Sequence, residues 1–299
     1  MELNKINGHS YYIKGGTNTG VYVFKDKSAL VIDAGHTVGR GRRICSSLEE
    51  NGMRARYVYT THEHFDHYEV FQGIKQPAPH VELIAHEMAR PYIENLYIGK
   101  AYLVSSAPPK FQGKSADEAT RYFSVDIPVN EKLTIKDRDF EIHHVPGHCM
   151  GQAVIITDDR VCYLGDSVFD RTIMAKYDMP FLYSIDYQRQ SLEKIKNLDF
   201  DHGLIAHSKN VYSKSEIDKI IDENVEVLDR YEADIIEILK TPSSREEILQ
   251  QLLVINEIEC NFETYHYNYS TTGAFIASLA ERNIIDYTYD QGKIYYYGI

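Results

Sequence analysis

The chain has 299 residues, of which 43% are hydrophobic and 25% are charged, and its formal net charge is −12 at pH 7. This length predicts one large domain, alone or with a small one, with ample apolar material for a buried core. The acidic charge disfavours a nucleic-acid partner, because it repels a phosphate backbone at long range. No apolar run approaches the ~20 residues that a membrane span needs, so no membrane partner is expected.

The N-terminal stretch MELNKINGHSYYIKGG has neither the basic start nor the apolar middle of a secretory signal. A cytoplasmic location is therefore expected. The four cysteines, Cys45, Cys149, Cys162 and Cys260, lack the paired spacing of a zinc knuckle or a small disulfide framework. Free, reduced thiols are expected.

The chain up to residue 61 contains a first series of predicted strands, interrupted by one helix pattern. Three short segments rich in β-branched and aromatic residues are separated by Gly, Asn, Asp or Lys turns, which predicts strands. In the next stretch Ile44 and Leu48 have helical spacing, and a glycine follows its end. The predicted elements are strands over 11–16, 19–24 and 29–35, a helix over 37–52 and a strand over 55–61.

A second β series, punctuated by Pro-Gly and Asp-Asp turns, begins at Lys132. Between the two series lies a tyrosine-rich, mostly helical or irregular stretch over residues 86–127, and such an insertion often covers a site. The predicted elements are strands over 132–147, 153–159 and 160–169, a helix over 185–199 and a short buried strand over 202–208.

The pattern changes after residue 212. Residues 213–240 form one long amphipathic segment, which Ser213 or Ser215 can cap. Two further helices and a two-stranded hairpin follow, and this order indicates a small winged-helix module over 241–299. We therefore expect a main domain over residues 1–212 and a C-terminal helical and winged-helix-like module over residues 213–299.

The motif THEHFDH at residues 61–67 places three histidines and an aspartate in six consecutive positions. Side chains two apart in an extended backbone point the same way, so His62 and His64 can share one metal ion. Asp66 and His67 lie where the chain turns and can serve a second ion. Imidazole and carboxylate suit zinc, iron or manganese, and the absence of cysteine disfavours a purely structural zinc site.

Isolated histidines are usually surface or core residues, but four potential ligands in six positions do not fit that interpretation. Buried imidazole and carboxylate groups are costly unless they are paired. Three more candidate ligands each follow the end of a predicted strand: His148, Asp166 and His207.

With these motifs, residues from about 10 to 212 resemble the metallo-β-lactamase superfamily of hydrolases. The resemblance implies an αββα sandwich, here a catalytic domain with a C-terminal appendage, and a pair of divalent ions, zinc by default with iron or manganese also compatible. It implies that Asp33, in the segment VIDAG, supports the histidine loop. The implied ligands are His62, His64 and His148 for the first ion, Asp66, His67 and His207 for the second, and Asp166 as a bridge.

The resemblance also implies a reaction in which a hydroxide between the ions attacks an electrophilic centre, with Asp66 orienting it or relaying its proton. True β-lactamases lack the bridging aspartate, so Asp166 disfavours antibiotic hydrolysis. Oxygen-reducing di-iron members have glutamate where this chain has His64, which disfavours a redox role. A small-molecule carboxyl ester, thioester or lactone is therefore the expected substrate, as in thioesterases and lactonases of the family.

Two alternatives remain open. The first is a phosphodiesterase or ribonuclease that uses the same ions, although residues 241–299 hold three basic against eight acidic residues, a poor composition for binding nucleic acid. The second is a non-enzymatic regulator that keeps the metal site as a scaffold. In some family members such an appendage lies near the active-site mouth or at a dimer interface, so a homodimer is one expectation for this chain.

Overall fold

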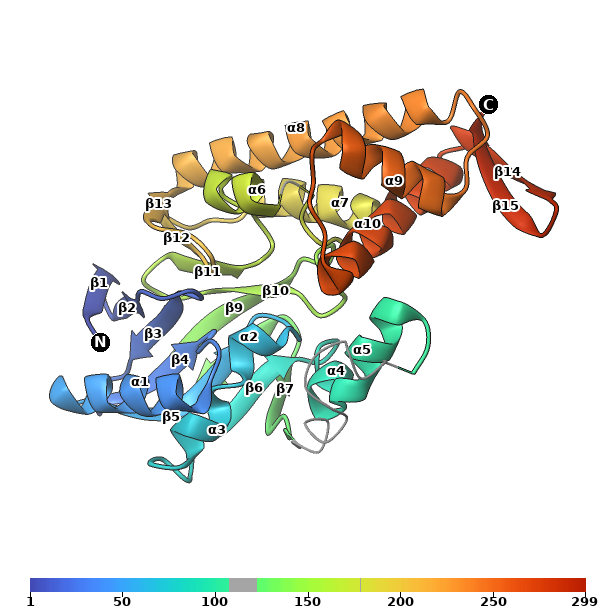
Figure 1. Cartoon of the computed structure of the whole chain (residues 1–299). Helices are drawn as coiled ribbons and strands as arrows, with labels where there is room; N and C mark the ends of the chain where they lie inside the picture. The colour runs from blue at the N-terminus through green and yellow to red at the C-terminus, as the bar shows by residue number, and fades with distance from the viewer. Residues whose placement is uncertain (108–122, 178) are drawn as a thin grey trace.

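The computed structural model describes residues 1–107, 123–177 and 179–299. Two β-sheets face one another, and helices cover the outer face of each (Figure 1). The strands are β1 (Leu3–Asn7), β2 (Ser10–Ile13), β3 (Thr19–Val23), β4 (Ser28–Ile32), β5 (Arg54–Thr60), β6 (Glu82–His86), β7 (Ile127–Val129), β8 (Lys132–Ile135), β9 (Arg138–His144), β10 (Ala153–Ile156), β11 (Val161–Gly165), β12 (His202–Ile205), β13 (Val211–Ser213), β14 (Ile285–Asp290) and β15 (Lys293–Gly298). The helices are α1 (Val38–Glu50), α2 (Phe65–Tyr68), α3 (Phe71–Lys75), α4 (Arg90–Glu94), α5 (Leu96–Val104), α6 (Arg171–Tyr177), α7 (Ile185–Lys196), α8 (Lys214–Ile238), α9 (Arg245–Ile255) and α10 (Phe262–Glu281).

The first sheet has the strand order β1-β2-β3-β4-β5-β6-β7. Its first four strands pair antiparallel, and β4 to β7 pair parallel. Parallel strands are covered on both faces, which explains the fully buried SALVI sequence of β4. On the outer face, α1 and α3 approach closely because both carry glycine at their contact. A Cβ at Gly73 would lie 2.1 Å from the carbonyl oxygen of Val38.

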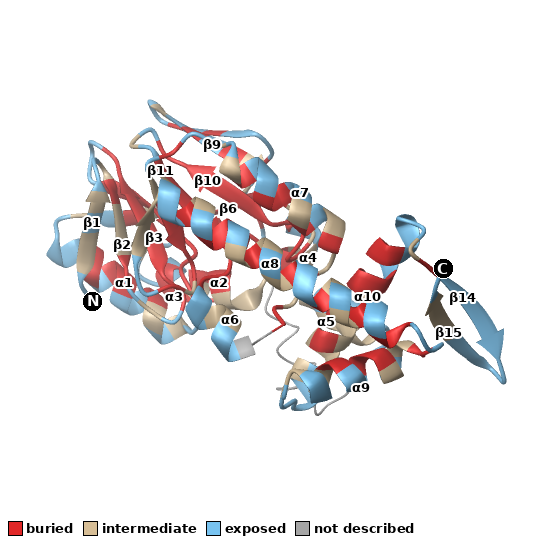
Figure 2. Ribbon diagram, turned by 90° about the horizontal axis from the view of Figure 1, so that it is seen from above, coloured by how far each residue is buried: buried red, intermediate tan, exposed pale blue. Residues whose placement is uncertain are grey.

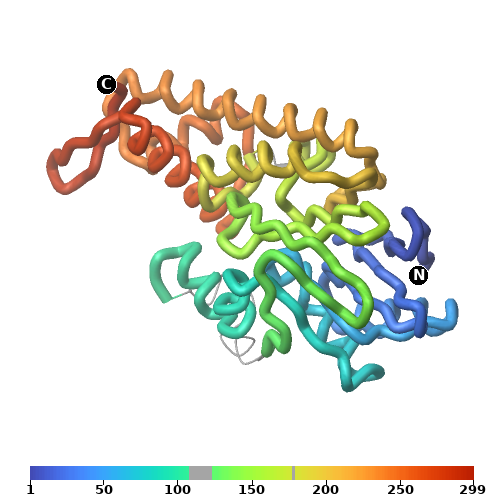
Figure 3. Tube along the Cα trace, turned by 180° about the vertical axis from the view of Figure 1, so that it is seen from behind, coloured from blue at the N-terminus to red at the C-terminus, as the bar shows by residue number. Residues whose placement is uncertain are grey.

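The second sheet has the order β13-β12-β11-β10-β9-β8, in which only the pair β11 and β12 is parallel. Helices α6, α7 and α8 lie along its outer side (Figures 1 and 3). Together the helices and sheets form the αββα sandwich that the family resemblance implies.

Buried residues concentrate on the strands of both sheets, as Figure 2 shows. The cluster that combines residues of the two sheets includes Tyr22, Phe140, Tyr163 and Leu204. The rings of Tyr22 and Phe140 meet edge to face with their centroids 4.9 Å apart. Aromatic burial of this kind contributes strongly to the stability of a core.

The C-terminal helices share a hydrophobic core with the second sheet. One apolar cluster contains Leu164 of β11, Ile217 of α8 and Phe275 of α10. Helices α8 and α9 each begin with a capping box, in which the side chain of Ser213 or Ser244 accepts from the backbone three residues later. The cluster crosses residue 212, and the proposed division into two domains there stays a prediction.

Most of the expected helices and strands are present, including α9 and the β14–β15 hairpin. Sequence patterns missed β1, β6, β7, β13, α2, α3 and α6. The last helix, expected over 271–285, begins at Phe262, because Asn261 caps it through the backbone of Thr264. Of the insertion expected over 86–127, residues 108–122 lie outside the described chain. Among the helices of the described residues, none combines the length and apolar content needed to cross a membrane.

Candidate metal centre

The candidate ligands come together where strands of both sheets end. His62, His64, Asp66 and His67 follow β5, and the first turn of α2 places Asp66 and His67 beside one another. His148 follows β9, Asp166 follows β11 directly, and His207 follows β12. Parallel neighbours such as β11 and β12 end at the same sheet edge, which brings their following residues together.

One group consists of His62, His64 and His148, whose candidate ligand atoms all lie within 4.8 Å of one another. Nε2 of His148 is 2.8 Å from Nδ1 of His64. The ring centroids of His62 and His64 are 4.7 Å apart. Three imidazoles converging in this way are a typical ligand set for a divalent transition metal.

A second group consists of Asp66, His67 and His207 and meets the same distance limit. Oδ2 of Asp66 lies 3.8 Å from Nε2 of His67 and 3.4 Å from Nε2 of His207. The Asp66 side chain is 50% exposed, whereas that of His67 is fully buried. This group therefore opens toward solvent on its aspartate side.

Asp166 connects the two groups. Its Oδ2 lies 4.0 Å from Nε2 of His62 and 3.7 Å from Nε2 of His148, both of the first group. The same oxygen lies 3.5 Å from Nε2 of His67 and 3.4 Å from Nε2 of His207, both of the second group. The structure thus brings together all seven candidate residues, and Asp166 lies close to histidines of both groups.

Hydrogen bonds on the far side of the rings set which nitrogen carries the proton. Nδ1 of His148 donates to the carbonyl oxygen of Phe181 at 2.8 Å, and Nδ1 of His207 donates to that of Gly16 at 2.7 Å. Because a carbonyl oxygen can only accept, the lone pair of each neutral ring is on Nε2, the atom that faces the cluster.

The residues fit a pair of metal ions. His62 and His67 are completely buried, yet within the described chain their Nε2 atoms have no hydrogen-bond partner. An unpaired polar atom at such depth is costly, and coordination to a cation would remove that cost.

The surroundings of the first group lower the pKa values of its three histidines. Burial and the neighbouring imidazoles lower the pKa of His62 well below its usual range and that of His148 to about 4. Burial also lowers the pKa of His64. These rings are therefore neutral near pH 7, the form that binds metal.

The second group is different because it contains carboxylates. Burial disfavours the charged form of His67, yet Asp166 and Asp33 raise its pKa to about 10. At His207 burial is likewise outweighed by Asp166 and Asp66, which raise the pKa to about 12. Two metal ions would take the place of these protons as counter-charges to the carboxylates.

Asp33, at the end of β4, supports the histidine loop as predicted. Its Oδ1 accepts from the backbone N–H of Thr61 and its Oδ2 from the Thr61 hydroxyl, each at 2.8 Å. Oδ2 is also 3.2 Å from Nδ1 of His67. Its φ of 49° lies in the left-handed region, which aspartate tolerates better than most residues.

Glu63 lies inside the motif but was not among the predicted site residues. Its half-buried carboxylate accepts from the backbone N–H of Gly151 at 3.1 Å and from the thiol of Cys149 at 3.2 Å. It thereby ties the loop of His62 and His64 to that of His148. The signal in the sequence was an acidic residue between two candidate histidine ligands. The Cys149 side chain that contacts it is buried.

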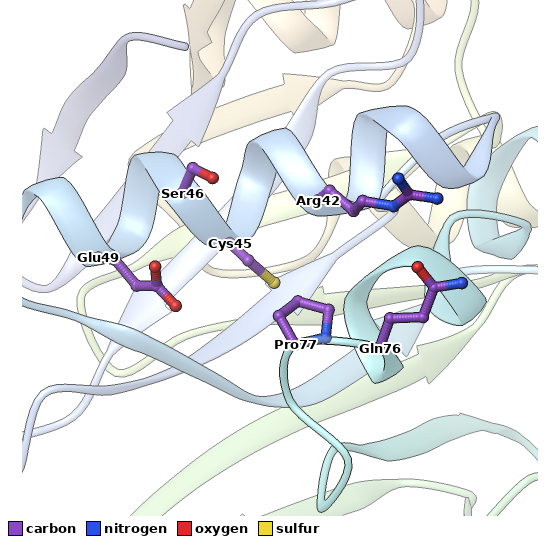
Figure 4. A pocket seen from close by; sticks show the side chains of 6 residues that line it. All are labelled: Arg42, Cys45, Ser46, Glu49, Gln76 and Pro77. Atoms are coloured by element: carbon purple, nitrogen blue, oxygen red, sulfur yellow. The ribbon is translucent and has the colours of Figure 1, made fainter.

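A separate hollow lies on the outer helix layer. Its lining residues come from α1 and from the turn after α3, and none belongs to the metal groups (Figure 4). They are Arg42, Cys45, Ser46, Glu49, Gln76 and Pro77. The chemistry of the site is therefore located at the strand ends and outside this hollow.

The sandwich fold and its cluster of histidines and aspartates at the strand ends define a metal-dependent hydrolase of the metallo-β-lactamase type. The family model described as the metallo-beta-lactamase superfamily matches residues 12–202. The chain belongs to this superfamily.

Solved structures with the same fold include a beta-lactamase domain protein from Burkholderia ambifaria, with a TM-score of 0.77 and 14% identity over 100% of this chain and 94% of that one. A metallo-beta-lactamase family protein from Thermus thermophilus has a TM-score of 0.69 and 14% identity, covering 97% and 99% of the two chains. A subclass B3 metallo-beta-lactamase of Bradyrhizobium japonicum has a TM-score of 0.58 and 19% identity, covering 78% and 94%. No curated protein sequence matches the chain. At these identities the likeness establishes the fold.

Proposed function

We propose that this protein is a dinuclear hydrolase of a small-molecule carboxyl ester, thioester or lactone. The observation that carries the proposal is the Asp166 carboxylate, which lies within 4.0 Å of histidines from both ligand groups. A carboxylate in this place can serve two cations at once. A complete set of seven ligands is typical of the hydrolytic members of the family, as the sequence resemblance implies.

Each side chain has a role in this proposal. His62, His64 and His148 would hold the first ion, Asp66, His67 and His207 would hold the second, and Asp166 would serve both. The donor set of imidazole and carboxylate suits zinc, and it also accepts iron or manganese. When bound, such a pair supplies Lewis acidity and lowers the pKa of a water toward ~7.

Asp66 is the residue we assign to proton handling. Of the two aspartates in the cluster it is the more exposed, with half of its side chain accessible. Burial would raise its pKa, but His67 and His207 hold that pKa below its usual range, so it is a carboxylate at neutral pH. A carboxylate in this exposed place can orient a water molecule or relay its proton.

Aromatic rings beside the first group favour an acyl substrate. The ring centroid of Phe181 is 5.8 Å from those of His64 and His148, and that of Phe169 is 5.6 Å from His148. Tyr267 of α10 extends this surface, with its ring 5.5 Å from Phe181. Apolar and aromatic walls with a few polar groups are typical of sites for small organic ligands.

The test is a substrate panel on protein whose metal content has been measured. It contains p-nitrophenyl esters, acyl thioesters, homoserine lactones and bis-p-nitrophenyl phosphate, each with and without a chelator. We expect about two equivalents of metal and chelator-sensitive hydrolysis of a carboxyl substrate. Preferential cleavage of the phosphodiester would replace our proposal with the nuclease alternative, and inactivity of the fully loaded protein on every substrate would favour a regulator.

A further inference from the structure

The segment from Met179 to Ser184 precedes α7 and contacts the metal centre chiefly through Phe181. The backbone N–H of Tyr183 also lies 2.8 Å from the carbonyl oxygen of Gly147 and 3.3 Å from that of His148. The carbonyl oxygen of Phe181 accepts the Nδ1 proton of His148 at 2.8 Å. The Phe181 ring packs against the His64 and His148 rings, at 5.8 Å from each. The Phe181 carbonyl therefore sets which nitrogen of His148 faces the cluster and helps to orient its ring.

Helix α10 holds this peptide from the other side. The Thr271 hydroxyl accepts from the backbone N–H of Leu182 at 3.0 Å and donates to the carbonyl oxygen of Pro180 at 3.4 Å. The two bonds flank Phe181 on both sides along the chain. Thr271 has no solvent exposure, so water cannot replace its hydroxyl without a change in packing.

We propose that Thr271 positions His148 for the first metal ion, so that α10 is part of the metal centre. This inference rests on the proposed function, because it takes His148 as a ligand. Thr271 acts through the backbone of residues 180–182 and does not face the cluster itself. It lies outside residues 12–202, the part of the chain that matches the family model.

The effect should be confined to one of the two ions. His207, in the second group, donates its Nδ1 proton to Gly16 on the loop before β3, and this bond does not involve α10. Nδ1 of His67 lies 3.2 Å from Oδ2 of Asp33, which directly follows β4. Loss of the Thr271 hydroxyl should therefore weaken the first site and leave the second unchanged.

The experiment uses metal-free full-length protein in a His207→Ala background, in which the second group is incomplete. Thr271→Val removes the hydroxyl and keeps the shape of the side chain. Thr272→Val is the matched control, because the next residue is equally buried but its hydroxyl donates only to Asn268, within α10. Thr271→Ser retains the hydroxyl. Zinc affinity is measured by competition with a chromophoric chelator, and cobalt(II) absorption reports the ligand geometry.

We expect Thr271→Val to weaken zinc binding by about 10–100-fold, the range known for residues that orient metal ligands, and to alter the cobalt spectrum. Thr272→Val and Thr271→Ser should match the His207→Ala parent. If circular dichroism shows that Thr271→Val does not fold, Thr271→Ala and Thr272→Ala replace the two valine variants. Their zinc affinities are compared in the same way.

Two results would overturn the inference. One is an unchanged zinc affinity in the Thr271 variant, and the other is an equal loss in its Thr272 counterpart, which would indicate a general packing effect. Failure of the proposed function is a separate result, because the protein without substitutions would then bind no metal at this cluster or would hydrolyse none of the panel.

Discussion

The metal centre has two halves, one after the strands of each sheet, and these halves are built in different ways. The half on the first sheet is one loop, residues 62–67, whose supports Asp33 and Thr61 directly follow two strands of that sheet, β4 and β5. The half on the second sheet consists of three single residues on separate loops. Two of these residues, His148 and His207, are held by backbone carbonyl oxygens of distant segments. The first half is organised mainly by residues that follow strands of its own sheet, with Glu63 as its link to the His148 loop. The second half depends on how remote parts of the chain pack.

The largest effect is expected at the first half, for His64→Ala. This change removes one of the three imidazoles of the first group, and Nε2 of His148 loses its neighbour at 2.8 Å. We expect more than about 100-fold loss of metal affinity and hydrolysis, beyond the 10–100-fold typical of residues that only support a ligand. Metal analysis and the substrate panel provide the measurement. His80→Ala, at an exposed histidine, is the control, and a fully loaded, fully active His64→Ala protein would refute the ligand assignment.

A smaller effect is expected for Asp33→Ala, which removes the local support of the same half. Two donors on Thr61 lose their buried acceptor, and His67 loses its neighbour. The free energy of unfolding should fall by at least about 1–3 kcal/mol, the cost of an unsatisfied buried group, and zinc affinity should fall by about 10–100-fold. Urea unfolding of the metal-free protein and chelator competition measure the two effects. Normal zinc affinity in this variant would mean that the loop does not need Asp33.

At the second half, Asn224→Ala should lower stability more than metal binding. Asn224 of α8 accepts from the backbone N–H of Phe169 at 3.0 Å and donates to its carbonyl oxygen at 2.7 Å. Its loss leaves both groups buried without a partner and should cost about 1–3 kcal/mol of unfolding free energy. Since Phe169 is three residues beyond Asp166, zinc affinity should change less than in Asp33→Ala. Urea unfolding and chelator competition measure both variants. A larger loss of zinc affinity in Asn224→Ala than in Asp33→Ala would contradict the comparison of the two halves.

The smallest effect is expected for Lys25→Ala, far from either half. Lys25 and Asp137 form an ion pair at 3.1 Å, but their side chains are 72% and 59% exposed. Water and salt screen such a pair, so its loss should leave the urea midpoint and the metal content unchanged within error. A clear shift in either quantity would show that the surface charges are coupled to the site.

The sequence by itself determined the elements with strong periodicity and the part of the site that is contiguous. Strand and helix patterns depend on neighbouring residues, so α1, α7, α8 and α9 were predictable from local spacing. The crowding of His62, His64, Asp66 and His67 directly after β5 indicated a metal site for the same reason. Local spacing did not assign His148, Asp166 and His207 to the same site. The family resemblance gave that assignment.

Tertiary structure alone decided how the second half is held. The acceptors for His148 and His207 are the backbone carbonyl oxygens of Phe181 and Gly16, and every residue carries such an oxygen. Residue type therefore gives no sign of their role. The sequence likewise gives no sign of the role of Thr271. A threonine hydroxyl in a helix usually forms its hydrogen bond within that helix, as that of Thr272 does. Only packing against the 179–184 segment turns its hydroxyl toward another part of the chain.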